Sequence, residues 1–336
     1  MKVCVVGAGS IGGLLAARLA RAGEEVTVIA RGAHLAAIRS DGLTLLEEDG
    51  RALNAPVAAT DDIRAAGRHD LVVLGMKAHQ VAEVAPALDA LCHERTSILT
   101  AQNGIPWWYF LKGVNGHAGQ GLESVDPGGV VAAHVAVERV LGSVVYPAAE
   151  ISAPGTIRLI EGNRFSLGEL DGAETDRVRA VSEALTRAGF KAPVVADIRS
   201  EIWMKLWGNL SLNPISALTH ATLEDICRFP DSRALVAEMM AEARAVGEAL
   251  GIRFRISIDK RIAGAEAVGR HKTSMLQDVE AGRAVEIDAL VGSVLELGRI
   301  TGVPTPQIGA VHGLVKLLAK VLADEGGRLA VTRREG

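Results

Sequence analysis

The sequence predicts an α/β protein in which a doubly wound parallel sheet is followed by an all-helical domain. Short β-branched runs alternate with helical segments through the first half, which is typical of right-handed βαβ units and a parallel sheet. A Gly-rich turn directly follows the first run and opens the first helical segment. Beyond Val194-Val195 almost every segment has helical periodicity instead. We therefore expect one domain over residues 1–180 and a second over 190–325, with the boundary near 170–195.

Five short apolar runs are the expected strands of the first domain, each rich in β-branched residues. They are Val3–Val6, Glu25–Ile29, Leu71–Leu74, Ser97–Thr100 and Gly142–Tyr146. Residues 11–22, rich in Leu and Ala, predict the helix after the first strand. Farther along, Thr156–Ile160 and Arg164–Leu167 flank Glu161-Gly162-Asn163, which predicts a β-hairpin. Residues 174–188 predict a further helix.

Composition and charge narrow the range of partners. Of the 336 residues, 49% are hydrophobic and 23% are charged, which is typical of a folded globular protein. The formal net charge of −4 gives no reason to expect a nucleic acid or an anionic membrane as a partner. No run of ~18 apolar residues occurs, so we expect no membrane span.

Cysteine usage indicates the compartment. Cys4, Cys92 and Cys227 are odd in number and far apart, and they show no CxxC or Cys/His metal spacing. This pattern favours a reducing environment, and the start of the chain lacks the charged lead, apolar core and cleavage site of a signal peptide. We therefore expect a cytoplasmic protein without a bound metal.

The stretch Gly7-Ala8-Gly9-Ser10-Ile11-Gly12 fits the pattern GxGxxG. Directly after a strand and at the start of a helix, this pattern is typical of the dinucleotide site of a Rossmann-type sheet. Glycine allows a tight turn, approach of the backbone to the pyrophosphate and close helix–sheet packing, while the helix N-terminus supplies N–H groups for the phosphates. The alternative is a Gly-rich turn without a cofactor.

The end of the second strand indicates which dinucleotide is bound. A site for NAD carries Asp or Glu there to bond the ribose hydroxyls, whereas this chain has Ala30-Arg31-Gly32. Arg31 can fork onto a 2′-phosphate and has no acid nearby in the sequence to compete, so we expect NADPH. The alternative is a solvated surface arginine.

Lys77 and Asn103 each follow a predicted strand. The carboxyl ends of the strands form the edge at which open α/β sheets bind ligands, so both side chains are candidates for the site. Either could instead be an ordinary loop residue.

The segment from Glu201 to Pro214 predicts a helix with a polar stripe on an apolar surface. Lys205, Asn209 and Asn213 are spaced i, i+4 and i+8 and therefore share one side, while Trp, Met and Leu occupy most of the rest. A helix that is apolar on most sides is buried, and burial lowers the pKa of a lysine towards neutrality, which suits a proton donor. The alternative is a lysine that extends to solvent and two capping asparagines.

A second polar segment includes Ser274 and Glu286. Ser274 could N-cap a helix, with Gln277 completing a capping box. Glu286 opens an apolar helical run and reads on sequence alone as a first-turn helix residue more readily than as a catalytic one. No GxSxG, HExxH or P-loop motif occurs, whereas reduction of a ketone needs a dinucleotide, a proton donor and polar groups that hold the substrate.

In their order along the chain these residues resemble the ketopantoate reductase (2-dehydropantoate 2-reductase) family, from Met1 to about Leu318. The matching positions are the glycine turn, Arg31, Lys77, Gln102-Asn103-Gly104, Lys205-Leu206, Asn209, Asn213-Pro214, Ser274–Asp278 and Glu286. The ordered combination is more specific than any single motif.

The resemblance implies NADPH-dependent reduction of a small-molecule 2-keto acid, 2-dehydropantoate, to D-pantoate. Hydride would go to the C2 ketone and Lys205 would donate the proton. It also implies that Asn103, Asn209, Asn213 and Ser274 orient the substrate. Glu286 would lie near the reacting centre and the nicotinamide ribose, and Ala148 would pack near the cofactor. A homodimer formed through the helical domain is implied as well.

The chain departs from the family pattern at Trp107-Trp108-Tyr109-Phe110, a block followed by a Gly-rich segment to Gly129. It also departs at Leu159, where many relatives carry a histidine, and at Leu223, where some carry an asparagine. The aromatic block could line a larger pocket, form a lid, or pack in a subunit interface or a local core. Two alternatives therefore stay open: a reductase of a bulkier 2-keto acid and, from another class, a non-catalytic NADPH-binding sensor.

Overall fold

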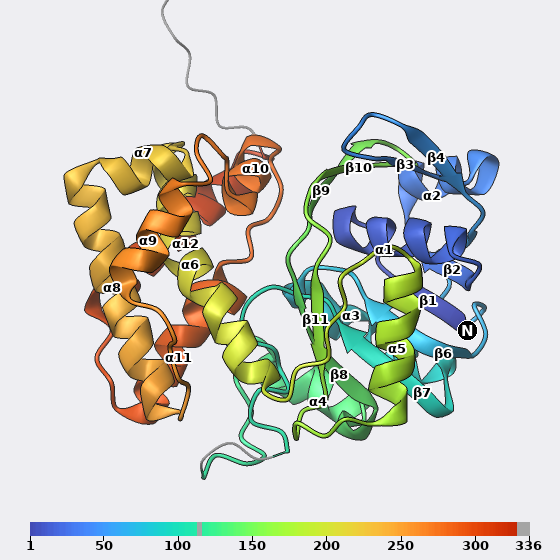
Figure 1. Cartoon of the computed structure of the whole chain (residues 1–336), viewed down its shortest axis with the longest axis horizontal. Coiled ribbons are helices and arrows are strands. Elements are labelled where there is room, and N and C mark those ends of the chain that lie inside the picture. The colour runs from blue at the N-terminus through green and yellow to red at the C-terminus, as the bar shows by residue number, and fades with distance from the viewer. Residues whose placement is uncertain (113–115, 328–336) are drawn as a thin grey trace, which may run out of the picture. The chain divides into compact units, whose positions relative to one another are not determined.

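The computed structural model describes residues 1–112 and 116–327 and divides the chain into two compact units, Met1–Ile202 and Trp203–Gly336 (Figure 1). The division falls inside helix α6 (Ile198–Thr219), later than the expected 170–195. No helix in the described residues is both long and apolar enough to cross a membrane.

The first turn of α6 belongs to the first unit because its side chains pack on the strands there. A β-carbon at Gly142 would lie 2.8 Å from Ile198, and one at Gly168 would lie 3.0 Å from it. Ile198 therefore fits against two strands only because both positions are glycine. The unit boundary follows this contact, which no composition change along the chain marks.

A seven-stranded sheet forms the centre of the first unit. In order across the sheet, the strands are β11 (Phe165–Gly168), β8 (Val140–Val145), β7 (Cys92–Thr100), β6 (His69–Leu74), β1 (Lys2–Val6), β2 (Glu25–Ile29) and β5 (Ala58–Thr60). All neighbouring pairs are parallel except β8 and β11. The predicted doubly wound parallel sheet and its five strands are confirmed.

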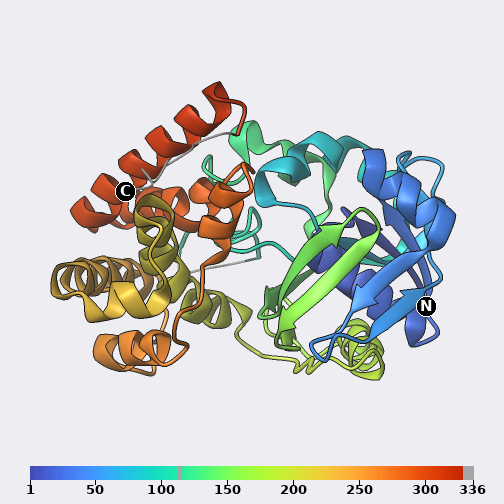
Figure 2. The same ribbon diagram turned by 90° about the horizontal axis from the view of Figure 1, so that it is seen from above.

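A second sheet of four strands was missed by the sequence interpretation. Its order is β4 (Ala52–Ala55), β3 (Leu43–Leu46), β10 (Thr156–Glu161) and β9 (Ala148–Ala153), and Figure 2 shows the green pair β9 and β10 beside the blue β3 and β4. The predicted hairpin is wrong, because β10 pairs with β9 and β3 whereas β11 pairs with β8. Gly162, at φ 80°, lets the chain pass from one sheet to the other.

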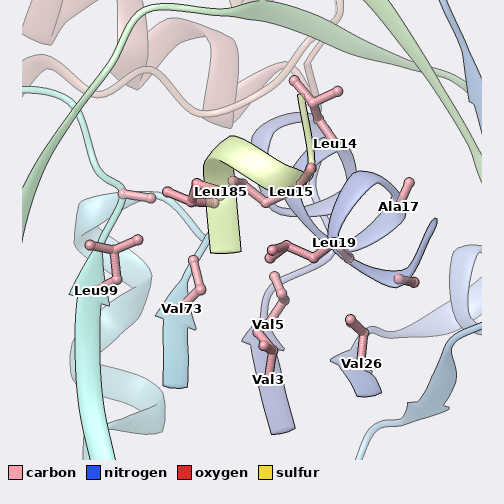
Figure 3. Packing of buried hydrophobic residues seen from close by; sticks show 14 of the residues in the cluster. Val3, Val5, Leu14, Leu15, Ala17, Leu19, Val26, Val73, Leu99 and Leu185 are labelled. Carbon is pink, nitrogen blue, oxygen red and sulfur yellow. The ribbon is translucent and has the colours of Figure 1, made fainter. Parts of the chain in front are cut away.

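Two helices bury the core on one face of the large sheet (Figure 3). They are α1 (Ser10–Arg21) and α5 (Asp176–Arg187). Figure 3 shows Leu15, Leu19 and Leu185 on the side that faces Val3, Val5 and Val73, whereas Leu14 points away from these strands; all of them are fully buried. Each such leucine contributes about 1.5–3 kcal/mol of transfer free energy. The predicted helices over 11–22 and 174–188 are therefore present, the second capped by Thr175, whose Oγ1 accepts from the Val178 N–H at 3.3 Å.

Short helices complete the first unit. They are α2 (Gly32–Asp41), α3 (Val81–Val84), α4 (Val130–His134) and the 3-10 segments η1 (Ala78–Gln80), η2 (Ala85–Leu91), η3 (Pro127–Gly129) and η4 (Val137–Arg139). Helix α2 packs against β3 of the four-stranded sheet and against β5 of the seven-stranded sheet, and so contacts both sheets.

The aromatic block is buried in the first unit. Trp108, Tyr109 and Phe110 are fully buried, and the Trp108 indole donates to Thr100 Oγ1 at 3.1 Å. Arg199 donates to the backbone carbonyls of Tyr109 and Leu111 at 2.9 Å each, and its guanidinium lies 5.7 Å from the centre of the Trp108 ring. Of the alternatives, the local core describes Trp108 best. Residues 113–115 of the following Gly-rich segment lie outside the described residues.

The described part of the second unit is entirely helical, as expected. After α6 it contains α7 (Leu223–Arg228), α8 (Pro230–Ala249), α9 (Ile258–Glu266), α10 (Ser274–Glu280), η5 (Asp288–Gly292, a π-helix), α11 (Ser293–Thr301) and α12 (Pro306–Asp324). Helix α6 continues through Pro214 and donates the Trp207 indole N–H to Met240 O of α8 at 2.7 Å.

Candidate functional site

The glycine motif forms the turn between β1 and α1. Gly7 has φ 94°, a conformation that favours glycine, and the amides of Gly7 and Ala8 donate to Ile29 O of β2 at 3.1 and 3.2 Å. Gly9 is the N-cap residue of α1, and no acidic residue lies in the first turn of this helix. The turn therefore presents a helix N-terminus with its amides and partial positive charge.

Close packing requires glycine at three positions around this turn. A β-carbon at Gly7 would lie 2.9 Å from Met76 N, one at Gly12 would lie 2.0 Å from Gly7 O, and one at Gly75 would lie 2.8 Å from both Gly7 O and Gly12 Cα. Gly75 directly follows β6, which lies beside β1 on the side away from β2. This is the crevice where the strand order reverses, the usual ligand position in such sheets. The sequence interpretation missed Gly75, although a glycine directly after a buried strand was its signal.

Gly9 differs from these glycines. Its φ is −65°, and a β-carbon there would meet Gly75 O only at 3.8 Å, an ordinary contact. Neither backbone strain nor protein packing requires glycine at this position. The absent β-carbon instead leaves the backbone of the turn accessible, and this fits a pyrophosphate that approaches it closely.

Lys77 and Asn103 lie at the same edge of the sheet. They follow β6 and β7, which are adjacent and parallel. Gln102 ties the two loops together, because its Nε2 donates to Leu74 O at 2.6 Å and to Met76 O at 3.2 Å. Gln102 is thus a supporting residue whose role the sequence did not indicate. Ala148 begins β9 of the other sheet, and β9 packs against α1.

Arg31 is the N-cap residue of α2 and is exposed. The expectation that no acid lies near it holds only along the chain, because the fold places Glu83 Oε2 of α3 at 4.0 Å from its Nη1. Both side chains are mostly in solvent, where such a pair contributes little stability. Arg31 can therefore leave Glu83 for a stronger acceptor such as a phosphate.

In the second unit the polar stripe of α6 is present as predicted. Lys205 and Asn209 are half-buried and Asn213 is buried, whereas Trp203, Leu206, Trp207 and Leu210 are almost fully buried. Burial lowers the pKa of Lys205 from 10.5 to about 8, and the nearby carboxylate of Glu286 opposes this shift. The fold therefore brings Lys205 and Glu286 together, from segments that are distant in the sequence.

Glu286 is not a first-turn helix residue, and Ser274 is not a helix cap, which were the alternatives to a role in the site. Glu286 immediately precedes the helical residues that begin at Ile287. The alternative that Ser274 caps a helix is wrong: Thr273 is the N-cap residue of α10, and its Oγ1 accepts from the Leu276 N–H at 3.2 Å. Ser274 is therefore an exposed residue of the first helical turn, and its hydroxyl is not needed for the cap.

Within residues 1–112 and 116–327, no three His, Cys, Asp or Glu side chains gather as metal ligands would. The titratable group with a clear functional signature is instead Lys205. The first unit thus carries the glycine turn, and the second carries Lys205 with the carboxylate of Glu286 nearby.

Comparisons with known proteins match most of the chain. The family model described as ketopantoate reductase PanE/ApbA matches residues 3–172, and its C-terminal counterpart matches residues 197–319. A 2-dehydropantoate 2-reductase of Mesorhizobium japonicum is 54% identical over 95% of this chain and 98% of its own length. One of Halobacterium salinarum is 29% identical over 94% of this chain and 98% of its own length.

Solved structures give the same result for the fold. A structure from Ralstonia solanacearum MolK2 superposes with a TM-score of 0.91 at 42% identity and covers 95% of this chain and 98% of its own. A PanE/ApbA family ketopantoate reductase from Ralstonia eutropha JMP134 superposes with a TM-score of 0.82 at 27% identity and covers 96% of this chain and 100% of its own.

The glycine contacts predict the effect of Gly75→Ala. The new β-carbon would meet backbone atoms at 2.8 Å, so the turn has to shift, and we expect the free energy of unfolding to fall by about 1–3 kcal/mol. Gly121→Ala is the control, because its β-carbon meets nothing within 4 Å. Urea titration followed by tryptophan fluorescence measures both. Equal stabilities of the two variants would contradict the close approach.

Proposed function

This chain belongs to the ketopantoate reductase family, and from that premise we propose that it reduces 2-dehydropantoate to D-pantoate with NADPH. Enzymes of this family use a nicotinamide cofactor. The observation that carries the proposal is Lys205: a lysine with a pKa of about 8, on the one polar stripe of an apolar helix and beside a carboxylate. Such a group is suited to donate a proton near neutral pH.

The glycine turn is the proposed cofactor site. Amides of residues 7–12 and the N-terminus of α1 would hold the pyrophosphate, over the accessible backbone at Gly9. Arg31 would bind the 2′-phosphate of NADPH, Lys77 and Asn103 would contact the cofactor from the adjoining strand ends, and Ala148 would pack near it. NADPH, when bound, supplies the hydride.

Lys205 is the proposed catalytic acid. Its Nζ would donate a proton to the C2 oxygen of the substrate as negative charge develops there. Glu286 would keep this lysine protonated, because its negative charge raises the pKa of the ammonium group, and it would also contact the nicotinamide ribose. Asn103, Asn209, Asn213 and Ser274 would orient the keto acid through hydrogen bonds.

Assembly and location are part of the same proposal. Leu314, Leu317 and Val321 lie along one side of α12 and are 55%, 59% and 36% exposed, which suits a contact between two copies of the helical unit. We propose a homodimer on this basis. Cys4, Cys92 and Cys227 are buried and free, a state that suits the reducing cytoplasm.

The two alternatives lack a supporting observation. A bulkier substrate was suggested by the aromatic block, but Trp108 is committed to Thr100 and Arg199 in the interior. A non-catalytic sensor needs no lysine with a pKa near neutrality. Ketopantoate reduction therefore has the better support.

The direct test is NADPH oxidation by the purified protein, followed by absorbance, with 2-dehydropantoate and a panel of aromatic and branched 2-keto acids. We expect 2-dehydropantoate to give the largest kcat/KM. Larger values with an aromatic keto acid would move the substrate assignment. Absence of turnover with every keto acid, while NADPH still binds, would favour the sensor.

The pH profile tests Lys205. The lysine has to be protonated to act as an acid, so kcat should fall as the pH rises through about 8. Lys205→Met should lower kcat roughly 10²–10⁴-fold, whereas Lys260→Met on the exposed side of α9 should leave it unchanged.

Glu286→Gln extends this test. Removing the carboxylate takes away the influence that raises the pKa of Lys205. The alkaline limb of the profile should therefore move to lower pH, whatever happens to the maximal rate. An alkaline limb that stays in place in this variant would separate Glu286 from the proton donor.

Cofactor choice tests Arg31. Arg31→Ala should weaken NADPH binding about 10–100-fold and NADH binding by less than about threefold, because only NADPH carries the phosphate. Arg39→Ala, on the same helix but paired with Asp61 at 3.4 Å, is the control. Dissociation constants from nucleotide fluorescence decide the matter, and equal losses for both nucleotides would contradict the assignment.

A further inference from the structure

His34 of α2 joins two parts of the first unit through both of its ring nitrogens. Its Nε2 lies 2.8 Å from Ala8 O in the glycine turn, and its Nδ1 lies 2.9 Å from the backbone N of Gly155. Gly155 forms the turn between β9 and β10 in the four-stranded sheet. The imidazole thus bridges the β1–α1 turn and a turn of the other sheet.

The two contacts define the protonation state of the ring. The Gly155 amide can only donate, so Nδ1 has to accept, and the ring hydrogen has to be on Nε2, from which it is donated to Ala8 O. A protonated imidazolium carries hydrogen on both nitrogens and cannot accept from Gly155. Both bonds therefore exist only while the ring is neutral. Burial favours this form, since it lowers the pKa of His34, although the bond to Ala8 opposes the shift.

The bond to Ala8 acts on the amide that follows. Ala8 C=O and Gly9 N–H belong to one planar peptide unit and point in opposite directions. Holding the carbonyl on the His34 side therefore turns the Gly9 N–H to the other side. Gly9 is the position at which the turn is accessible, as its missing β-carbon leaves room.

The partner at the other end of the bridge is also held in place. Gly155 has φ 73°, which favours glycine, and a β-carbon there would lie 2.9 Å from the side chain of Ala37 on α2. The turn thus rests directly on the helix that carries His34. Movement of this turn and of His34 is therefore coupled.

We propose that His34 is a positioning residue of the cofactor site: its neutral ring orients the Gly9 peptide for the pyrophosphate of the nicotinamide dinucleotide, and its protonation releases that peptide. The inference rests on the proposed function for the assignment of the glycine turn to the cofactor. It predicts that protonation of His34 weakens dinucleotide binding at acid pH, although His34 itself does not contact the nucleotide.

The surroundings of His34 allow this loss of affinity at acid pH to be assigned to the His34 ring alone. Helix α2 packs mainly against β3 and β5, and His34 itself bonds the glycine turn and the Pro154-Gly155 turn; the sequences of these four segments contain no titratable residue. On α2 itself, Arg31 is near Glu83 and Arg39 bonds Asp61, and Asp41 accepts from Ser40. Among the described residues, no charged side chain is an influence on the ring.

The test is isothermal titration calorimetry of NADP⁺ with the whole protein from pH 8 down to about pH 4.5, because the pKa of His34 lies below its ordinary value. Its variants are His34→Ala, His34→Gln and, as control, His134→Gln, which replaces an exposed histidine bonded within α4. Glutamine can donate through Nε2 and accept through Oε1 as the neutral ring does, but it does not titrate. The 2′-phosphate titrates near pH 6 in every variant, so the difference between profiles is the measure.

At pH 8 we expect His34→Ala to raise the Kd about tenfold and His34→Gln to stay within about threefold of the wild type. As the pH falls through the lowered pKa of His34, the wild type and His134→Gln should weaken several-fold more than His34→Gln. In turnover, His34→Ala should raise KM for NADPH and leave kcat and KM for the keto acid unchanged.

The outcomes separate this inference from the proposed function. A wild type that binds NADP⁺, with an acid limb that His34→Gln shares, would overturn the role of His34 and leave the proposed function standing. Should His34→Ala fold poorly, the comparison of wild type with His34→Gln still decides. A wild type that does not bind NADP⁺ at any pH would overturn the proposed function itself.

Discussion

The close approach of backbone at Gly7, Gly12 and Gly75 is the constraint on which the first unit depends. None of these positions has room for a β-carbon, so strand β1, helix α1 and the loop after β6 can meet at one point. That point is the crevice where the strand order of the large sheet reverses. Gly9, in the same motif, has no such contact. One group of glycines therefore serves packing, whereas another leaves backbone accessible to a ligand.

Helix α2 extends this arrangement in two directions. Arg31, its N-cap residue, follows the end of β2, and His34 in its first turn bonds the carbonyl of Ala8. The same helix supports Gly155 of the second sheet. Arg31 and His34, the residues proposed to select the dinucleotide and to orient its binding turn, thus lie on a single short helix, which packs against strands of both sheets.

In the second unit, helix α6 places the ammonium group of Lys205 on a largely apolar helix surface. Burial lowers the pKa of Lys205, and the nearby carboxylate of Glu286 limits that shift. The balance leaves a pKa of about 8, at which the group is mostly protonated at neutral pH and still able to release a proton.

Local pattern determined much of this protein by itself: the strands β1, β2 and β6, helix α1, the GxGxxG turn and the polar stripe of α6. These features depend on residues within a few positions of one another, where periodicity and turn chemistry act directly. Tertiary structure alone decided that β10 leaves β11 for β9 and β3, because a pairing partner depends on long-range register. It also decided that Thr273 rather than Ser274 caps α10, that Glu83 lies near Arg31, and that His34 bonds Gly155. The last two contacts join residues 52 and 121 positions apart, and no local propensity encodes such distances.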